Sequence, residues 1–339
     1  MTLRLVLGVV VMTILSMALQ TPLTWQSAYM VFFVTKENRV ITTLTGVGVF
    51  LGATIGIAMS LFFYRYTFDY PELRIPVMAG SVFAGMFFSR VFAIGPVAFA
   101  AGFVLALTQS MAESVRNTDE LVRGLLWLWV IIVFPTAIAV IINQTLSPTD
   151  PKLTASAKPR KSLFVPDAFT NPNYVRFGLK VALAAMSCYI LYMALDWPGI
   201  RTAFITCCFI ALESNRATIG KARLRFIGCA IGGLLGFLAI MYLVPHMESI
   251  VSLAFLTAAG AALAGWVAAG SKRISYAGLQ IALAFFMCIF QGFAPDTHFA
   301  TIRNRVVGIL LGILVTSVVF YNLWPEPQAG GEKTSPDES

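Results

Sequence analysis

The chain has 339 residues, of which 58% are hydrophobic and 12% are charged, and its 24 Lys and Arg against 16 Asp and Glu give a net charge of +8. Soluble domains carry about 25% charged residues, so this composition excludes a soluble globular protein. It also excludes a disordered chain, because disorder requires low hydrophobicity and high charge. The lipid bilayer is therefore the expected solvent.

Eleven long windows without charged residues follow one another along the chain, and several match the roughly 20 apolar residues that cross a bilayer. The first window, residues 5–35, is too long for one span and has a polar middle from Gln20 to Ser27, so it predicts two spans. The expected fold class is all-α: a polytopic membrane helix bundle of about 12 transmembrane helices.

The first apolar stretch has an alternative interpretation as a signal peptide. Arg4 precedes an apolar region, and Ser16 to Ala18 resembles a cleavage site. The internal repeat described below argues against it, because this stretch has a counterpart deep in the chain.

Lys and Arg are unevenly distributed over the predicted loops. With the N-terminus inside, seventeen of the 24 basic residues face the cytoplasm and seven face outward. This bias orients membrane proteins, so we expect a multi-pass protein with both termini in the cytoplasm.

A polar, proline-rich and basic stretch interrupts the hydrophobic pattern in the middle of the chain. Such a composition is typical of a linker. We therefore divide the chain into a first six-helix membrane half, a cytoplasmic linker, a second six-helix membrane half and a polar cytoplasmic tail, which are residues 1–146, 147–172, 173–326 and 327–339.

The two halves repeat similar residues in the same order. Pro22 corresponds to Pro198 and Glu37 to Glu213, and a row of glycines at four-residue spacing follows in each half. Because each half has an even number of spans, we predict two parallel six-helix repeats related by an axis along the membrane normal. We interpret the glycines as sites of close helix packing rather than ligand binding; they are Gly48, Gly52, Gly56, Gly228, Gly232, Gly236, Gly308 and Gly312.

The second span of each half is unusually short, at about 14 residues, which is roughly 21 Å against a hydrocarbon core of about 30 Å. Short spans in matching positions indicate a transporter site, and a helix N-terminus at membrane depth suits a carboxylate. A short helix in a locally thinned bilayer, with its tryptophans in an aromatic belt, is the alternative. The candidate substrate-binding residues are Trp25, Ser27, Trp197, Arg201, Thr202 and Thr206.

Acidic residues near the ends of these short spans are candidates for proton coupling, because acids at membrane depth often serve proton relays. They are Glu37, Glu213 and Asp196. The alternatives are interfacial ion pairs for the two glutamates and a solvated turn for Asp196. Basic residues at the inner mouth are candidates for gathering anionic substrate, or for contacting anionic lipid; these are Arg39, Arg216, Arg223 and Arg225.

Motifs for other functions are absent from the sequence. No nucleotide-binding P-loop occurs, no nucleophile lies in a recognisable catalytic setting, and no metal-ligand spacing appears. The five cysteines fall inside apolar windows and are interpreted as reduced thiols. We therefore expect a protein that is not an enzyme, with no cofactor, no metal and no nucleic-acid partner.

Several segments resemble the fusaric acid resistance protein family, which includes the aromatic acid exporters. They are Arg176-Phe-Gly-Leu-Lys180, Ala194-Leu-Asp-Trp-Pro-Gly199, Thr218 through Gly236, Arg305 through Gly312 and Leu323-Trp-Pro325. The resemblance implies a bacterial inner-membrane component that exports small aromatic carboxylic acids, with a periplasmic adaptor and an outer-membrane channel as partners. Many members carry a large soluble domain between the halves, where this chain has a short linker; a homo-oligomer is left open.

The primary hypothesis is an inner-membrane secondary transporter that exports small aromatic or amphipathic organic acids, with proton coupling. An organic-anion channel and a non-transporting membrane scaffold of an efflux complex are the alternatives.

Overall fold

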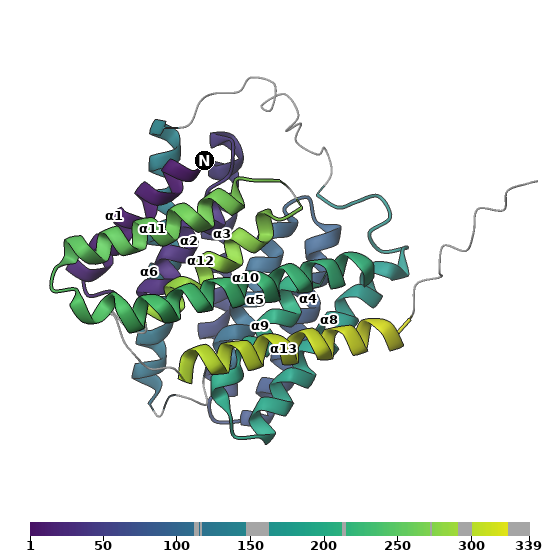
Figure 1. Ribbon diagram of the computed structural model, residues 1–339. Coiled ribbons are helices and arrows are strands. Elements are labelled where there is room, and N and C mark those ends of the chain that lie inside the picture. Colours follow the sequence, from purple (N-terminus) through teal and green to yellow (C-terminus); the bar gives the residue numbers. More distant parts are fainter. Residues whose placement is uncertain are drawn as a thin grey trace, which may run out of the picture.

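The computed structural model describes residues 1–111, 115, 117–146, 163–211, 215–271, 273–290 and 300–324. Its regular structure in these ranges is helical, with one isolated antiparallel bridge between Phe92 and Phe164. The all-α fold class predicted from the composition is confirmed for this part of the chain. Figure 1 shows the helices in chain order.

Six α-helices precede the linker and six follow it in the described residues. The first six are α1 (Thr2–Ala18), α2 (Thr24–Val34), α3 (Arg39–Thr67), α4 (Arg74–Val91), α5 (Gly95–Gln109) and α6 (Thr118–Leu146). The second six are α8 (Pro172–Ala194), α9 (Thr202–Ile210), α10 (Asn215–Tyr242), α11 (Ile250–Ala268), α12 (Ser275–Ile289) and α13 (Ala300–Asn322). Short 3₁₀ turns lie at Pro71–Leu73, Pro198–Ile200 and Val244–His246.

Six of the described helices are long and apolar enough to cross a membrane. They are α3, α6, α8, α10, α11 and α13. The described residues thus form 12 α-helices, as expected, and whether the other six also cross the membrane stays a prediction. Among these, α2 and α9 have 11 and 9 residues, about 16 and 14 Å at 1.5 Å per residue. The charge-free windows were longer than these helices because they also contain the turns at Pro22 and Pro198.

The helices of each half pack against one another in the same order. The first helix contacts the second and sixth, the third contacts the fifth and sixth, and the fourth contacts the fifth. The contacts between halves also correspond, because α1 packs on α11 and α8 packs on α4. Each half therefore places its first helix against the fourth helix of the other.

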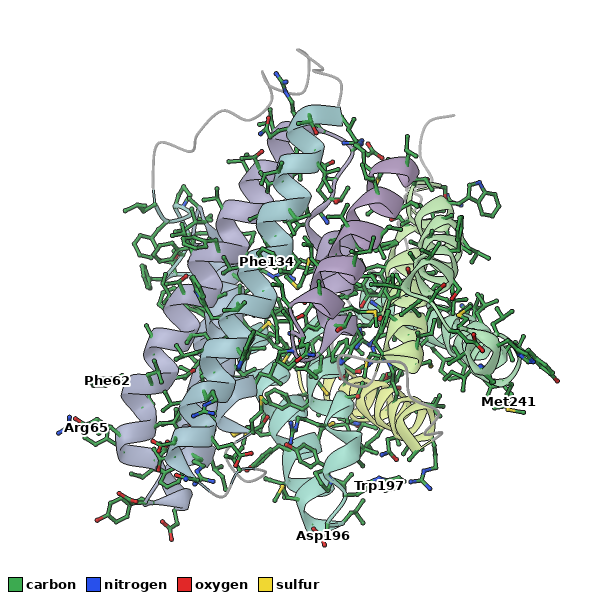
Figure 2. The ribbon with its side chains drawn as sticks, turned by 90° about the vertical axis from the view of Figure 1, so that its left-hand side faces the viewer. Phe62, Arg65, Phe134, Asp196, Trp197 and Met241 are labelled. Carbon is green, nitrogen blue, oxygen red and sulfur yellow. The ribbon has the colours of Figure 1, made fainter. Side chains whose placement is uncertain are left out.

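The long helices of the two halves cross instead of running side by side. In Figure 1, α10 and α13 extend across the view while α6 runs from top to bottom. Figure 2 shows α13, in yellow, nearly end-on beside the upright α3 and α6. The expected repeat axis along the membrane normal stays a prediction. In this crossed arrangement, α11 of the second half packs on α1 of the first half, and α4 of the first half packs on α8 of the second.

The glycine rows lie where α3 meets α5 and where α10 meets α12. A Cβ at Gly52 would be 2.5 Å from the Cβ of Ala100, and one at Gly232 would be 2.3 Å from the backbone oxygen of Ile281. Gly312 meets α9 in the same way. Since only a residue without a side chain permits these approaches, the interpretation of the glycines as packing sites is confirmed at these positions. At Gly48 an added Cβ would meet only the Val97 side chain, at an ordinary 3.6 Å.

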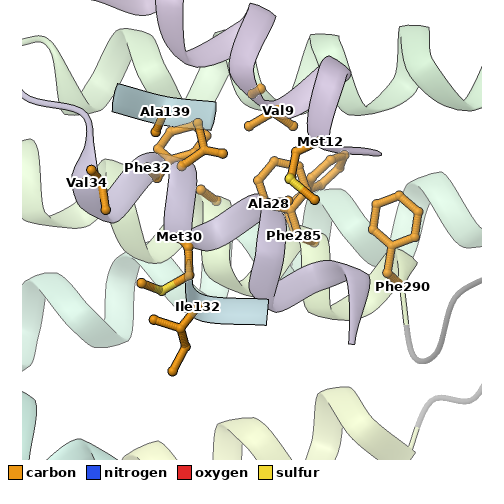
Figure 3. Close-up of a cluster of buried hydrophobic side chains, with 14 of the residues drawn as sticks. Val9, Met12, Ala28, Met30, Phe32, Val34, Ile132, Ala139, Phe285 and Phe290 are labelled. Atoms are coloured by element: carbon orange, nitrogen blue, oxygen red, sulfur yellow. The ribbon is translucent and has the colours of Figure 1, made fainter. Parts of the chain in front are cut away.

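The largest hydrophobic core joins the two halves. Figure 3 shows side chains of α1, α2, α6 and α12 meeting there, among them Met12, Phe32, Ala139 and Phe285. Phe32 of α2 also lies against Phe286 of α12, with 6.0 Å between ring centroids. The short helix α2 is thereby fixed between the halves, which positions its opposite face beside a cavity.

Candidate functional site

A cavity of about 540 Å³ lies between helices of both halves. Eight helices contribute to its walls: α2, α3, α5, α6, α9, α10, α12 and α13. Ligand sites of roughly 300–1,000 Å³ are typical of proteins that hold small organic molecules. Both unusually short helices, α2 and α9, line this cavity, as the repeat argument expected of a binding site.

Aromatic rings form much of the cavity wall. On α2, aromatic residues four positions apart share the face that lines the cavity. Phenylalanine rings of α5 and α9 pack edge to face against each other. Phe209 lies 5.6 Å from Phe99 and 5.0 Å from Phe103, with interplanar angles of 88° and 81°. Such edge-to-face clusters favour a further aromatic ring as neighbour. The lining aromatic residues are Trp25, Tyr29, Phe33, Phe99, Phe103 and Phe209.

The charged residues in the described lining are all cations. They are Lys36, Arg225 and Arg305, from the α2–α3 loop, α10 and α13. Arg225 and Arg305 are 2% and 7% exposed, and no described carboxylate lines the cavity. Because burying a charge without a counter-charge costs free energy, this arrangement favours an anionic occupant.

Other buried cations in the described chain have a different role. Arg4 donates to the Glu37 backbone oxygen at 3.0 Å, Arg74 to that of Thr67 at 2.9 Å, and Lys180 to that of Trp324 at 3.0 Å. These carbonyls lie at or just beyond helix C-termini, where cations are stabilised. Arg225 and Arg305 are the two buried cations of the described residues that face the cavity instead.

Neutral side chains orient Arg225. Its Nε donates to Thr206 Oγ1 at 3.2 Å, and one terminal nitrogen donates to Gln280 Oε1 at 3.0 Å and to the Tyr276 hydroxyl at 3.3 Å. These partners come from α9 and α12, so two neighbouring helices hold the guanidinium without neutralising its charge. A guanidinium has five N–H donors, which leaves capacity for a carboxylate.

Arg305 is less completely satisfied than Arg225. One of its terminal nitrogens contacts the Met287 sulfur, and its buried Nε has no hydrogen-bond partner. Thioether sulfur is a weak acceptor. A buried N–H without a partner costs about 1–3 kcal/mol, so a ligand oxygen at this position would be strongly favoured.

Lys36 lies outside the helices, between α2 and α3, with its Nζ 5.5 Å from the centroid of the Phe33 ring. Burial lowers the pKa of its ammonium group from the ordinary value of 10.5. The cation–π contact keeps the charge beside the aromatic wall. The third cation of the cavity is therefore both weakly hydrated and closer to deprotonation than a surface lysine.

The structure brings together four of the residues that sequence analysis selected for substrate binding or for the inner mouth. Trp25, Thr202 and Arg225 line the cavity, and Thr206 holds Arg225. Ser27 is buried away from the lining. Trp197 and Arg201 also lie outside it; the Trp197 indole donates to Asn304 Oδ1 at 3.1 Å.

The remaining candidates lie elsewhere. Glu37 and Asp196 are exposed, and Figure 2 shows Asp196 and Trp197 near the same end of the molecule as Arg65. Arg39 is half-buried and Arg223 is exposed. Glu213 and the side chain of Arg216 lie outside the described residues. Arg225 was expected at the inner mouth with the other basic residues, and the structure corrects this placement: it is buried, because Thr206, Tyr276 and Gln280 draw it into the protein.

Sequence analysis did not select Lys36, Arg305 or the phenylalanines of α5 and α9. Arg305 was named only as the first residue of a segment that resembles the fusaric acid resistance family, and not as a binding residue. The regular spacing of Trp25, Tyr29 and Phe33 was the one available signal, because residues four apart share a helix face.

Curated relatives match half of the chain. A multidrug resistance protein MdtO of Shigella flexneri is 36% identical over 185 residues, which is 54% of this chain and 27% of the relative. The proteins of the same name from Escherichia coli K12 and Escherichia coli O157:H7 are 36% and 37% identical over 54% and 52% of this chain. The match thus spans about a quarter of the length of these relatives.

A family model also matches the second half of the chain, and its match includes the last ten residues of α8, all of α9 to α12 and all but the last residues of α13. No solved structure matches the chain. The matches are to resistance proteins, in agreement with the expectation that the chain is not an enzyme. Residues 185–319 match the family described as Fusaric acid resistance protein-like, so the resemblance drawn from the sequence is confirmed for this multi-pass membrane protein.

Proposed function

We propose that the chain is an inner-membrane transporter that exports small aromatic or amphipathic organic acids and related toxic compounds. One observation carries this proposal: a cavity of about 540 Å³ combines aromatic rings with three cations and has no described carboxylate. The ring of an aromatic acid fits the apolar wall and its carboxylate fits the arginines. The names of the relatives, which denote multidrug resistance, support export of such compounds.

The two arginines define the carboxylate end of the proposed site. Arg225 and Arg305 come from different helices, and because both are cations they repel each other. A carboxylate between them would accept from both and would supply the missing partner of Arg305 Nε. The phenylalanines of α5 and α9 then contact the apolar part of the substrate.

The architecture that we propose for this transporter is two six-helix repeats. The corresponding helix contacts within the halves support it, as does the exchange in which α1 meets α11 and α8 meets α4. In such an arrangement the short second helices, α2 and α9, would occupy equivalent positions on either side of the cavity. The crossing of the long helices indicates a repeat axis inclined to α3 and α6.

Proton coupling through Glu37, Glu213 or Asp196 belongs to this proposal, as do a periplasmic adaptor and an outer-membrane channel. Coupling requires a group whose proton uptake is linked to substrate movement. Both termini would lie in the cytoplasm, in keeping with the distribution of basic residues.

The channel alternative is favoured by one observation. In the part of the chain that the structure describes, no Asp or Glu is buried, whereas five cations are. A path lined by cations alone passes anions without needing a proton carrier. Uptake with and without a pH gradient therefore distinguishes a proton-coupled transporter from a channel.

The test uses the purified full-length chain in liposomes and follows uptake of radiolabelled benzoate, a minimal aromatic carboxylate. We expect accumulation when a pH gradient is imposed, and loss of accumulation in Glu213→Gln or Glu37→Gln. Equilibration without accumulation would replace the transporter with the channel. Absence of benzoate binding to the chain would contradict both.

Raising the pH is expected to weaken benzoate binding before a free lysine would titrate. The pKa of Lys36 is lowered by burial, so its charge is lost at a lower pH than that of a free lysine, while benzoate stays ionised. Equilibrium binding in nanodiscs measures this effect. The Lys36→Arg variant is the control and should bind equally across the range; identical profiles for both proteins would exclude Lys36 as the titrating group.

A further inference from the structure

The row of cations does not end at the cavity. On α10, Lys221 lies one turn before Arg225, so the two side chains share a helix face. Arg90, at the end of α4, and Arg225 both exert Coulomb repulsion on Lys221. Lys221 is therefore close to both Arg90 and Arg225, and it does not itself line the cavity.

One tyrosine connects Lys221 with the cavity. The Nζ atom of Lys221 lies 5.0 Å from the centroid of the Tyr276 ring, and the hydroxyl of the same tyrosine accepts a hydrogen bond from Arg225 at 3.3 Å. Tyr276 is the second residue of α12, and its side chain thus contacts both cations. Arg90 is held nearby over the Phe177 ring, 4.4 Å from its centroid.

Lys221 and Arg225 repel each other, and this repulsion destabilises the site when no anion is bound. The observed neighbours of Lys221 and Arg225 are an aromatic ring and neutral oxygens, so these contacts leave their repulsion in place. Like charges at short range in a partly buried setting are costly. The same arrangement gives an arriving anion an attraction that is strongest between Lys221 and Arg225, and it weakens with salt.

We propose that Lys221 is the loading residue of the cavity: it captures the carboxylate of an arriving aromatic acid and transfers it past Tyr276 to Arg225. This inference rests on the proposed function, because it assumes that the cavity holds organic anions. Tyr276 has a positioning role, with its ring holding the ammonium and its hydroxyl holding the guanidinium. Arg90 and Lys221 form the doorway, and Arg225 and Arg305 form the seat.

A doorway residue affects rates and not the final affinity. For the full-length chain in nanodiscs, we expect Lys221→Gln to lower the association and dissociation rate constants of benzoate by the same factor, about tenfold at low salt. The Kd should stay within about twofold of the wild-type value, and the dependence of the association rate on salt should become flatter. Stopped-flow tryptophan fluorescence measures both rate constants.

Two matched variants control for the loss of a charge. Arg223→Gln removes a cation from the same helix at an exposed position and should leave both rate constants unchanged. Lys221→Arg keeps the charge at the doorway and should retain most of the association rate. If Lys221→Gln does not fold, Arg90→Gln tests the same doorway and should reduce both rate constants in the same manner.

The outcomes separate this inference from the proposed function. An unchanged association rate in Lys221→Gln, with Arg225→Gln still weakening binding, would overturn the loading role alone. An increase in the Kd of Lys221→Gln through faster dissociation would make Lys221 part of the seat and would also overturn it. A wild-type chain that does not bind benzoate, or an Arg225→Gln variant with unchanged Kd, would contradict the proposed function itself.

Discussion

Replacing Arg305 with glutamine is expected to raise the Kd for benzoate by about 10- to 100-fold. The wild-type guanidinium is 7% exposed and its Nε has no hydrogen-bond partner, so a ligand carboxylate should gain a full charge-assisted bond there. Such bonds contribute about 1.5–3 kcal/mol, which corresponds to this loss of affinity. Equilibrium binding of benzoate in nanodiscs is the measurement.

Arg303 provides a matched control for this variant. It lies two residues earlier on α13, its guanidinium is exposed over the Trp197 ring, and it does not line the cavity. Arg303→Gln should therefore leave the Kd unchanged, while Arg305→Lys should retain part of the affinity because it keeps the charge but loses the planar fork. Equal Kd values for Arg305→Gln and the wild type would remove Arg305 from the binding site.

Adding one methyl group at Gly232 is expected to destabilise the fold. The new Cβ would lie 2.3 Å from the backbone oxygen of Ile281, and a helix backbone cannot move away as a flexible side chain can. Overpacking of this kind costs about 1–3 kcal/mol, while the gain in helix propensity from Gly to Ala returns only about 1 kcal/mol. Gly232→Ala should lower the melting temperature in detergent by several degrees.

Gly124 is the corresponding control, because it lies in helix α6 and no atom is within 4 Å of a Cβ built there. Gly124→Ala should be neutral or slightly stabilising through helix propensity alone. If the two variants melted at the same temperature, close packing between α10 and α12 would not be the reason for glycine at position 232.

The short helices could be predicted from the sequence, and the cavity composition could not. Prolines at 22 and 198 and the lengths of the following apolar stretches indicated helices close to the observed α2 and α9. The site itself combines residues from eight helices. A residue such as Arg305 gives no local signal of its neighbours, because Met287 and the cavity reach it only through tertiary packing.

The burial of Arg225 could not be predicted from the sequence either. Its position in a run of basic residues suggested a solvated mouth, since Arg223 and Arg225 look alike in sequence. The burial of one and the exposure of the other follow from helix geometry: Arg225 faces α12 and α9, whereas Arg223 faces outward. Which face of α10 is covered depends on partners more than 50 residues away along the chain.

In the proposed transporter, the two arginines at the seat would also connect the cavity to the membrane voltage. A site that alternates between the two faces of the membrane carries these unneutralised charges with it when it is empty, and carries less net charge when an organic anion is bound. Movement of one charge through the full field changes the energy by about 2.3 kcal/mol per 100 mV. In a cell that is negative inside, the voltage would return the empty site to the cytoplasmic face, where the next anion is loaded, so part of the work of export would be done by the membrane potential.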